Sequence, residues 1–142
     1  MKKIISIALA LLMVAVMLPV MAMAAEVTTA EDLKDAVANG GEVTLGDDIT
    51  ASITVKNGNT VTLNLNGHKL TNEAGSDTIY VEMGGTLIIK GTGTVDNVSH
   101  GRAAIFNNGT VTLNGGTYTR SAEKGTGKDS ENSANGNSWY TI

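Results

Sequence analysis

TVTL at 60–63, TLII at 86–89 and TVTL at 110–113 are three copies of one short stretch, with apolar residues at every second position. The copies begin 26 and 24 residues apart, and Asn-Gly or Gly-Gly pairs lie beside them. A period of two is the pattern of a strand with one buried face. Self-similarity every roughly 20–50 residues is typical of a solenoid. The sequence therefore predicts stacked β-coils.

Apolar residues form columns when the three copies are aligned. These columns are Ile53, Ile79 and Ile105; Val61, Leu87 and Val111; Leu63, Ile89 and Leu113; and Leu70, Val95 and Tyr118. Equivalent residues in stacked coils lie about 4.8 Å apart, so each column is expected to be a continuous interior stack. We predict an all-β fold, a right-handed parallel β-helix of about three coils over residues 42–120. An antiparallel sandwich or jelly roll of short strands is the alternative.

Residues 25–41 are predicted to cap the first coil with a short α-helix over about 30–38. Thr29 can accept a hydrogen bond from the backbone N–H three residues on, and Asp32 lies at the positive end of the helix dipole. The apolar stripe at helical spacing is Leu33, Ala36 and Val37. A terminal coil needs such a cover because its core would otherwise meet water.

The first 24 residues have the pattern of a secretory signal peptide. Lys2 and Lys3 precede an almost wholly apolar run from Ile4 to Leu18, and Ala22-Met23-Ala24 supplies a cleavage site with small residues. An uncleaved membrane anchor is the alternative, although the run is short for a span of about 20 residues. We therefore expect a bacterial exported protein, secreted or held at the cell surface, with no membrane segment after cleavage.

Cleavage would leave residues 25–142 and change the net charge from −4 to −6. An acidic chain has no electrostatic basis for binding nucleic acid or anionic lipid. The chain has no cysteine, which rules out disulfides and thiolate metal sites.

The apolar pattern stops at the end of the third coil. Residues 121–138 are rich in Ser, Gly, Asn, Lys and Glu and are interpreted as a polar loop insertion. Residues 139–142 restart an apolar strand, with Ile142 suited to the position of Ile53. An open coil end exposes unpaired backbone groups. We expect the chain to be the N-terminal part of a longer protein or to self-associate through this end.

Three passages resemble bacterial secreted parallel β-helix proteins of the pectate-lyase-like superfamily: VTLNLNGHKL at 61–70, GGTLIIKG at 84–91 and NGTVTLNGGT at 108–117. The resemblance covers roughly residues 26–120. It implies the β-helix architecture and a family that includes polysaccharide lyases, adhesins and cell-surface repeat proteins. Its long members have many more coils than this chain.

A lyase of this kind would need acidic residues clustered on one face to hold calcium, beside an arginine or lysine base. The acidic candidates are Asp47, Asp48, Asp77, Glu82 and Asp96, and none recurs at the coil period. They are interpreted as solvated turn charges. Arg102 and Arg120 lie near corners, and His68 and His100 do not align. No catalytic triad, phosphate loop or metal-ligand spacing is found. We expect no catalytic residues, no metal and no cofactor.

One outward column carries aromatic residues. If Ile79 and Ile105 point inward, Tyr80 and Phe106 point outward one coil apart, above Thr54. Aromatic faces can stack on sugar rings, so Tyr80 and Phe106 are a candidate glycan-stacking surface. A cross-strand aromatic pair that only shields the sheet is the alternative.

Two functional classes follow from these observations. The first is a non-catalytic secreted or cell-surface β-helix module with a structural or adhesive role, for which cell-wall or host polysaccharide is the candidate partner. The alternative is the N-terminal fragment of a pectate-lyase-like polysaccharide-active enzyme whose catalytic coils lie elsewhere.

Overall fold

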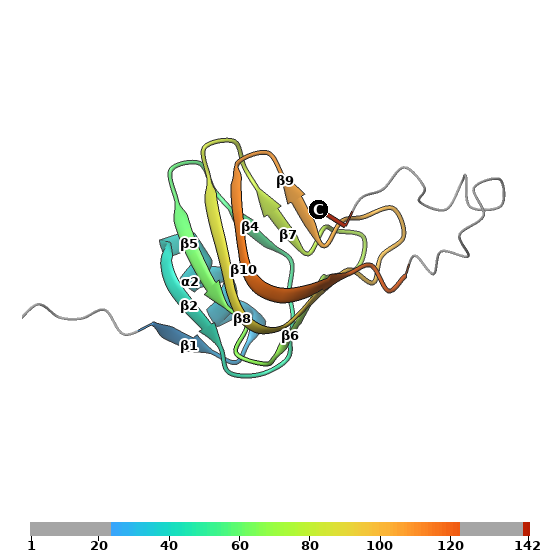
Figure 1. The fold of residues 1–142 in the computed structure, drawn as a ribbon, viewed down its shortest axis with the longest axis horizontal. Coiled ribbons are helices and arrows are strands. Elements are labelled where there is room, and N and C mark those ends of the chain that lie inside the picture. Colours follow the sequence, from blue (N-terminus) through green and yellow to red (C-terminus); the bar gives the residue numbers. More distant parts are fainter. Residues whose placement is uncertain (1–23, 123–140) are drawn as a thin grey trace, which may run out of the picture.

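The computed structural model describes residues 24–122 and 141–142 as a parallel β-solenoid with one helix at its N-terminal end (Figure 1). Every strand pair among these residues is parallel, which is incompatible with an antiparallel sandwich. The elements are β1 (Ala25–Val27), α2 (Ala30–Asn39), β2 (Gly41–Leu45), β3 (Ile49–Thr50), β4 (Ile53–Val55), β5 (Thr60–Asn64), β6 (Lys69–Thr71), β7 (Ile79–Val81), β8 (Thr86–Asp96), β9 (Ile105–Asn107) and β10 (Thr110–Thr119).

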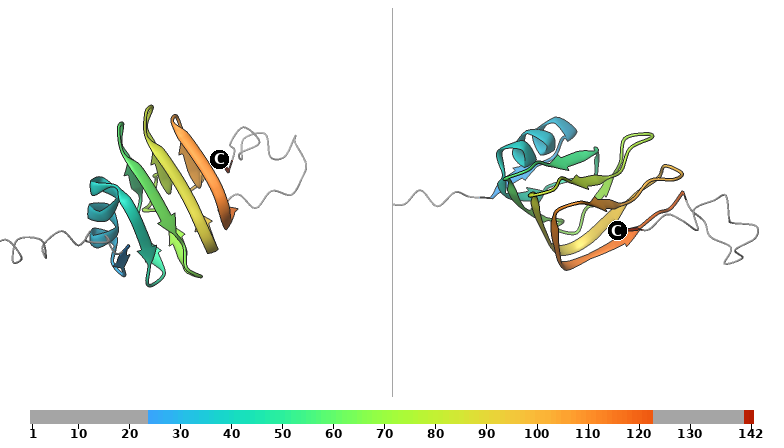
Figure 2. Two further views of the ribbon diagram at one scale, coloured as in Figure 1. Left: turned by 60° about the vertical axis from the view of Figure 1, so that its left-hand side comes forward. Right: turned by 90° about the horizontal axis from the view of Figure 1, so that it is seen from above.

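The strands form three faces that run along the solenoid. β2, β5 and the first halves of β8 and β10 form one face, which Figure 2 shows as a row of side-by-side strands. β3, β6 and the second halves of β8 and β10 form another. β4, β7 and β9 form a separate three-stranded sheet. The first coil is thus β4–β5–β6, the second is β7–β8, and the third is β9–β10.

The register of the coils matches the predicted columns residue for residue. Ile53, Ile79 and Ile105 are partners across β4, β7 and β9. The other three predicted columns are also in register, namely Val61, Leu87 and Val111; Leu63, Ile89 and Leu113; and Leu70, Val95 and Tyr118. The prediction of a parallel β-helix of about three coils with an N-terminal helix is therefore confirmed.

Corner glycines let single long strands serve two faces. β8 turns through Gly91, whose φ is +81°, and β10 turns through Gly116, whose φ is +79°. Glycine adopts these positive φ angles without strain because it has no Cβ.

Helix α2 covers the N-terminal end of the coil stack. Thr29 precedes it, and the Thr29 hydroxyl oxygen accepts the Asp32 N–H at 3.2 Å. The same hydroxyl donates to the Asp32 carboxylate at 2.7 Å. Leu33 and Val37 are buried beneath the helix, and its last turn is held by Asn59, whose amide donates to the Ala38 carbonyl at 2.9 Å.

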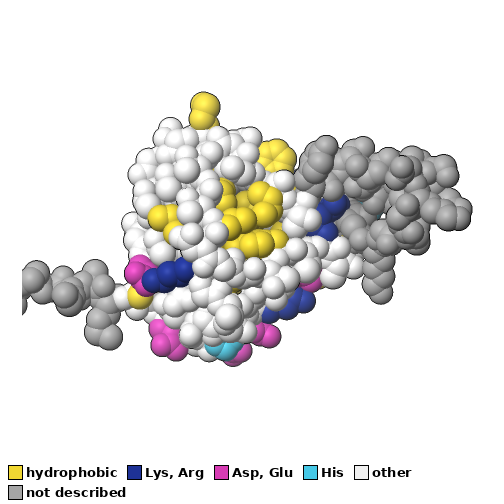
Figure 3. All heavy atoms as spheres, viewed as in Figure 1, with side chains coloured by type: hydrophobic (Ala, Val, Ile, Leu, Met, Phe, Trp, Pro, Cys, Tyr) yellow, Lys and Arg dark blue, Asp and Glu magenta, His cyan; other side chains and the backbone are white. Residues whose placement is uncertain are grey.

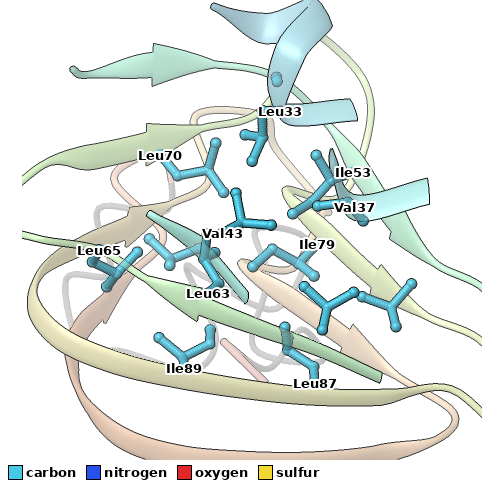
Figure 4. Close-up of a cluster of buried hydrophobic side chains, with 14 of the residues drawn as sticks. Leu33, Val37, Val43, Ile53, Leu63, Leu65, Leu70, Ile79, Leu87 and Ile89 are labelled. Atoms are coloured by element: carbon cyan, nitrogen blue, oxygen red, sulfur yellow. The ribbon is translucent and has the colours of Figure 1, made fainter. Parts of the chain in front are cut away.

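The interior is a single apolar core in which residues of successive coils stack (Figure 4). Leu63, Leu87 and Ile89 are fully buried. In the third coil the expectation of a continuous interior stack holds for Ile105, which is fully buried. It is wrong for Leu113, which is 39% exposed, and for Val111, which is only half-buried. No described strand covers that coil, and Figure 3 shows the apolar side chains gathered at this end.

Several sequence predictions concern residues that the structure does not describe. The signal peptide at 1–24, except Ala24, lies outside the described residues, as does almost all of the loop at 121–138. Of the strand at 139–142, only Thr141 and Ile142 are described. Within the described ranges, no helix is long and apolar enough to cross a membrane.

Candidate functional site on the β4–β7–β9 sheet

Tyr80 and Phe106 lie side by side on the outer face of the β4–β7–β9 sheet. The parallel register places Thr54, Tyr80 and Phe106 one above another. The two ring centroids are 5.6 Å apart and the ring planes are tilted by 33°. Phe106 is 43% exposed, and the Asn108 amide donates to the Tyr80 hydroxyl at 3.0 Å. The strand register and this hydrogen bond hold the two rings together as one aromatic platform, in which Phe106 is exposed and Tyr80 is half-buried.

A hollow of about 290 Å³ opens beside Tyr80. It is lined by Ser52, Ile53, Thr54, Gly75, Ser76, Asp77, Tyr80 and Arg102. Asp77 is held in place because its carboxylate accepts the Ala103 N–H at 2.7 Å. Arg102 is exposed at the same rim. An aromatic ring, a carboxylate, a guanidinium and hydroxyls therefore border one small hollow.

Of the acidic candidates away from this hollow, Asp48 and Glu82 bond the backbone of a neighbouring coil. Asp48 accepts the Lys69 N–H at 2.8 Å, and Glu82 accepts the Asn57 N–H at 3.0 Å. The Asp47 carboxylate accepts the N–H of Asp48, the next residue in the same turn, at 2.7 Å. These carboxylates are fastened to the fold rather than gathered into one cluster.

Among the residues that the structure describes, Asp96 is the one acid whose side chain is fully buried, at 1% exposure, so its interpretation as a solvated turn charge is wrong. It accepts hydrogen bonds from the Thr119 hydroxyl at 2.7 Å and from the Ser121 N–H at 2.9 Å. The Ser121 hydroxyl at 2.7 Å and the Lys69 ammonium at 3.0 Å complete its partners. Burial alone would raise the pKa of Asp96, but these hydrogen bonds outweigh it and lower the pKa to about 2.

A second hollow, of about 680 Å³, lies at the C-terminal end of the solenoid. Lys69, Asp96, Tyr118, Thr119, Arg120, Ser121 and Thr141 line it. Burial raises the pKa of the Tyr118 phenol, whose O–H donates to the Gly115 carbonyl at 2.7 Å. The hydrogen bonds of Asp96 to Thr119 and Ser121 join the second coil to the third.

Sequence reasoning missed a buried pair of asparagines at one corner. Asn72 and Asn97 are buried, and each follows a residue of the Thr71–Asp96 pair. The Asn97 amide donates to the carbonyls of Ser76 and Ala103, while Asn72 accepts the Val98 N–H at 2.7 Å. The sequence feature that could have predicted this pair is the spacing of Asn72 and Asn97 by one coil period. Polar residues that recur in register can stack and form hydrogen bonds with the backbone of the turn.

The two histidines lie at different corners. His68 follows β5, and its Nδ1 atom is 3.5 Å from an Asp48 carboxylate oxygen. His100 lies in the loop between β8 and β9. Among residues 24–122 and 141–142, no group of three or more His, Cys, Asp or Glu side chains is placed to hold a metal ion.

Comparison of the chain with protein-family models, with curated protein sequences and with solved structures gives no match. The fold and the geometry of its surface are therefore the basis for any functional inference.

Proposed function

We propose that this protein is a non-catalytic, secreted or cell-surface β-solenoid module that binds polysaccharide through the face around Tyr80 and Phe106. The observation that carries the proposal is the pair of exposed Phe106 and half-buried Tyr80, with ring centroids 5.6 Å apart, of which Tyr80 borders a polar hollow. Rings of this kind offer a sugar an apolar surface for stacking, and the polar rim offers hydrogen bonds to its hydroxyl groups.

The rigidity of the platform supports this proposal. Tyr80 and Phe106 project from paired strands, so the rings need little ordering when a ligand arrives. Asp77 is likewise held by the Ala103 N–H. A preformed face on a regular sheet is a suitable surface for an extended polymer, whose repeating sugars present similar faces.

The placement of the other acids favours binding over catalysis. Asp48, Glu82 and Asp96 each accept a backbone N–H from another coil. These carboxylates join successive coils. This structural role explains why the acids are present, and no catalytic role is needed to explain them. The signal peptide predicted at residues 1–24 is consistent with this proposal, because export would place the module outside the cell, where its polysaccharide targets lie.

The test is retention of the exported chain by insoluble polysaccharides of different chemistry, including cellulose, chitin, pectin and purified peptidoglycan. We expect at least one to retain the protein, and we expect Phe106→Ala to weaken that binding by about tenfold or more. Met83→Ala is the matched control, because Met83 is a 78% exposed apolar side chain in the turn between β7 and β8.

Thermal unfolding of both variants shows whether the fold survives. Retention by none of the polymers would overturn the proposal, as would binding that Phe106→Ala and Tyr80→Ala both leave unchanged. Release of sugar fragments from any of the polymers would instead favour the polysaccharide-active enzyme.

A further inference from the structure

The two ends of the solenoid differ in how they are covered. At the N-terminal end, α2 packs on β4 and β2, and the outer strand β1 is only three residues long. At the other end, the ten-residue strand β10 pairs with β8 on one side, and no described strand pairs with its other side. The molecule as described therefore has one long unpaired sheet edge.

Hydrogen bonds to β8 show which backbone groups of β10 face that open edge. The Thr110 N–H donates to the Gly85 carbonyl at 3.0 Å, so the backbone groups of Thr110 point toward the second coil. Successive residues of a strand alternate in direction. Val111 and Leu113 therefore direct their N–H and C=O groups away from β8.

The side chains of the same two residues end the apolar core. Val111 and Leu113 continue the columns of Leu87 and Ile89, yet Leu113 is 39% exposed and Val111 is half-buried. Figure 3 shows this apolar surface in the middle of the exposed coil end. β10 contains neither a charged residue nor a proline, the features that usually protect a sheet edge from pairing.

We propose that this edge is the interface of a two-fold dimer, in which β10 pairs antiparallel with β10 of a second copy. A second copy is the occupant that supplies a matching uncharged edge and a matching apolar cross-section. The opposite end of the chain cannot fill the role, because α2 covers it. The C-terminal end of one copy therefore cannot stack on the N-terminal end of the next. In the two-fold arrangement, the same C-terminal edge of both copies pairs instead.

The charge distribution is compatible with this arrangement. No charged side chain within β10 would meet its own copy across the axis. Arg120 follows the last residue of β10, so antiparallel pairing puts the two Arg120 residues at opposite ends of the β10–β10 interface. The edge of β9 is not part of the proposed interface, because the Ile105 N–H already donates to the Thr141 carbonyl at 3.0 Å.

The experiment is sedimentation of the full exported chain across a wide concentration range, with Leu113→Lys and Thr112→Lys as matched variants. Leu113 faces the coil end, whereas Thr112 is one residue away on the exposed outer face. We expect a reversible dimer for the natural chain and an unchanged dimer for Thr112→Lys, whose lysine side chain would lie on the outer face in solvent. For Leu113→Lys we expect at least about tenfold weaker dimerisation, since its ammonium would be buried against the apolar cross-section of the second copy.

Hydrogen exchange keeps the test independent of any loss of folding in the lysine variant. In the natural chain, the Val111 and Leu113 amides should become more protected as protein concentration rises. A chain that stays monomeric at every concentration would overturn the proposal, and so would open-ended oligomers. A dimer in which those two amides exchange at a concentration-independent rate would place the interface elsewhere.

Discussion

The Ile105 N–H donates to the Thr141 carbonyl oxygen at 3.0 Å. The Ile53 and Ile79 amides make the same bond, at the same distance, to the carbonyls of Thr78 and Ala104. Thr141 thus repeats, one coil further on, the position of the residue that precedes Ile79 and Ile105. Ile142 accordingly follows the column of opening isoleucines, as its sequence position suggests.

Removal of Thr141 and Ile142 should expose one particular amide. Ile105 would lose its acceptor, so its hydrogen exchange should accelerate. The Ile79 amide, which donates to Ala104, should exchange as before and is the internal control. Equal acceleration at both amides would show that the deletion loosens the whole sheet, and no change at Ile105 would show that the bond to Thr141 is not formed in solution.

Ile89→Asp should unfold the solenoid. Ile89 is fully buried between Leu63 and Leu113 in the column, and a carboxylate there would have no partner. We expect a loss of more than about 4 kcal/mol in the free energy of unfolding, measured by chemical denaturation. Ile88→Asp is the control, because Ile88 faces outward, and it should cost less than about 1 kcal/mol. Similar losses for the two variants would contradict the assigned register.

Asp96 should make stability depend on pH in the acid range. Its pKa is lowered from 3.8 to about 2 in the folded chain, so the unfolded chain takes up its proton first as the pH falls. The stabilisation, about 2 kcal/mol, is then fully present above about pH 5 and is lost as the pH approaches 2. Denaturation midpoints of the natural chain and of Asp96→Asn should converge as the pH falls through this window. Parallel curves would mean that Asp96 titrates normally.

Gly109→Ala should destabilise the stack through contact between coils. A Cβ at Gly109 would lie 2.5 Å from the Glu82 carbonyl oxygen and closer still to that of Gly85. We expect a cost of about 2–3 kcal/mol, read from thermal unfolding. Gly58→Ala is the control, because its φ of +81° is unfavourable for alanine but its Cβ would meet nothing within 4 Å. A smaller loss for Gly109→Ala than for Gly58→Ala would contradict the close approach of the two turns.

The order and register of the coils could be read from the sequence. The period of 24–26 residues and the alternation within each copy leave one way to stack Ile53, Ile79 and Ile105 with apolar side chains inward. A slip of one residue would turn every apolar side chain outward. The same alternation placed Tyr80 beside Phe106, since an inward column of isoleucines forces its neighbours outward.

Only the tertiary structure decided what covers each of these residues. Leu113 has the same local pattern as Leu63, yet it is exposed because no described strand lies over the third coil. The sequence around Asp96 predicts an ordinary solvated turn carboxylate. In the structure Asp96 is buried, because Thr119, Ser121 and Lys69 bond to it from other coils. The hollow beside Tyr80 likewise joins side chains from different coils, such as Ser52 and Arg102. Periodicity fixes neighbours along a column, because strand spacing and side-chain alternation are local properties. Burial and polar pairing depend on which distant segments meet at a corner, which no local pattern specifies.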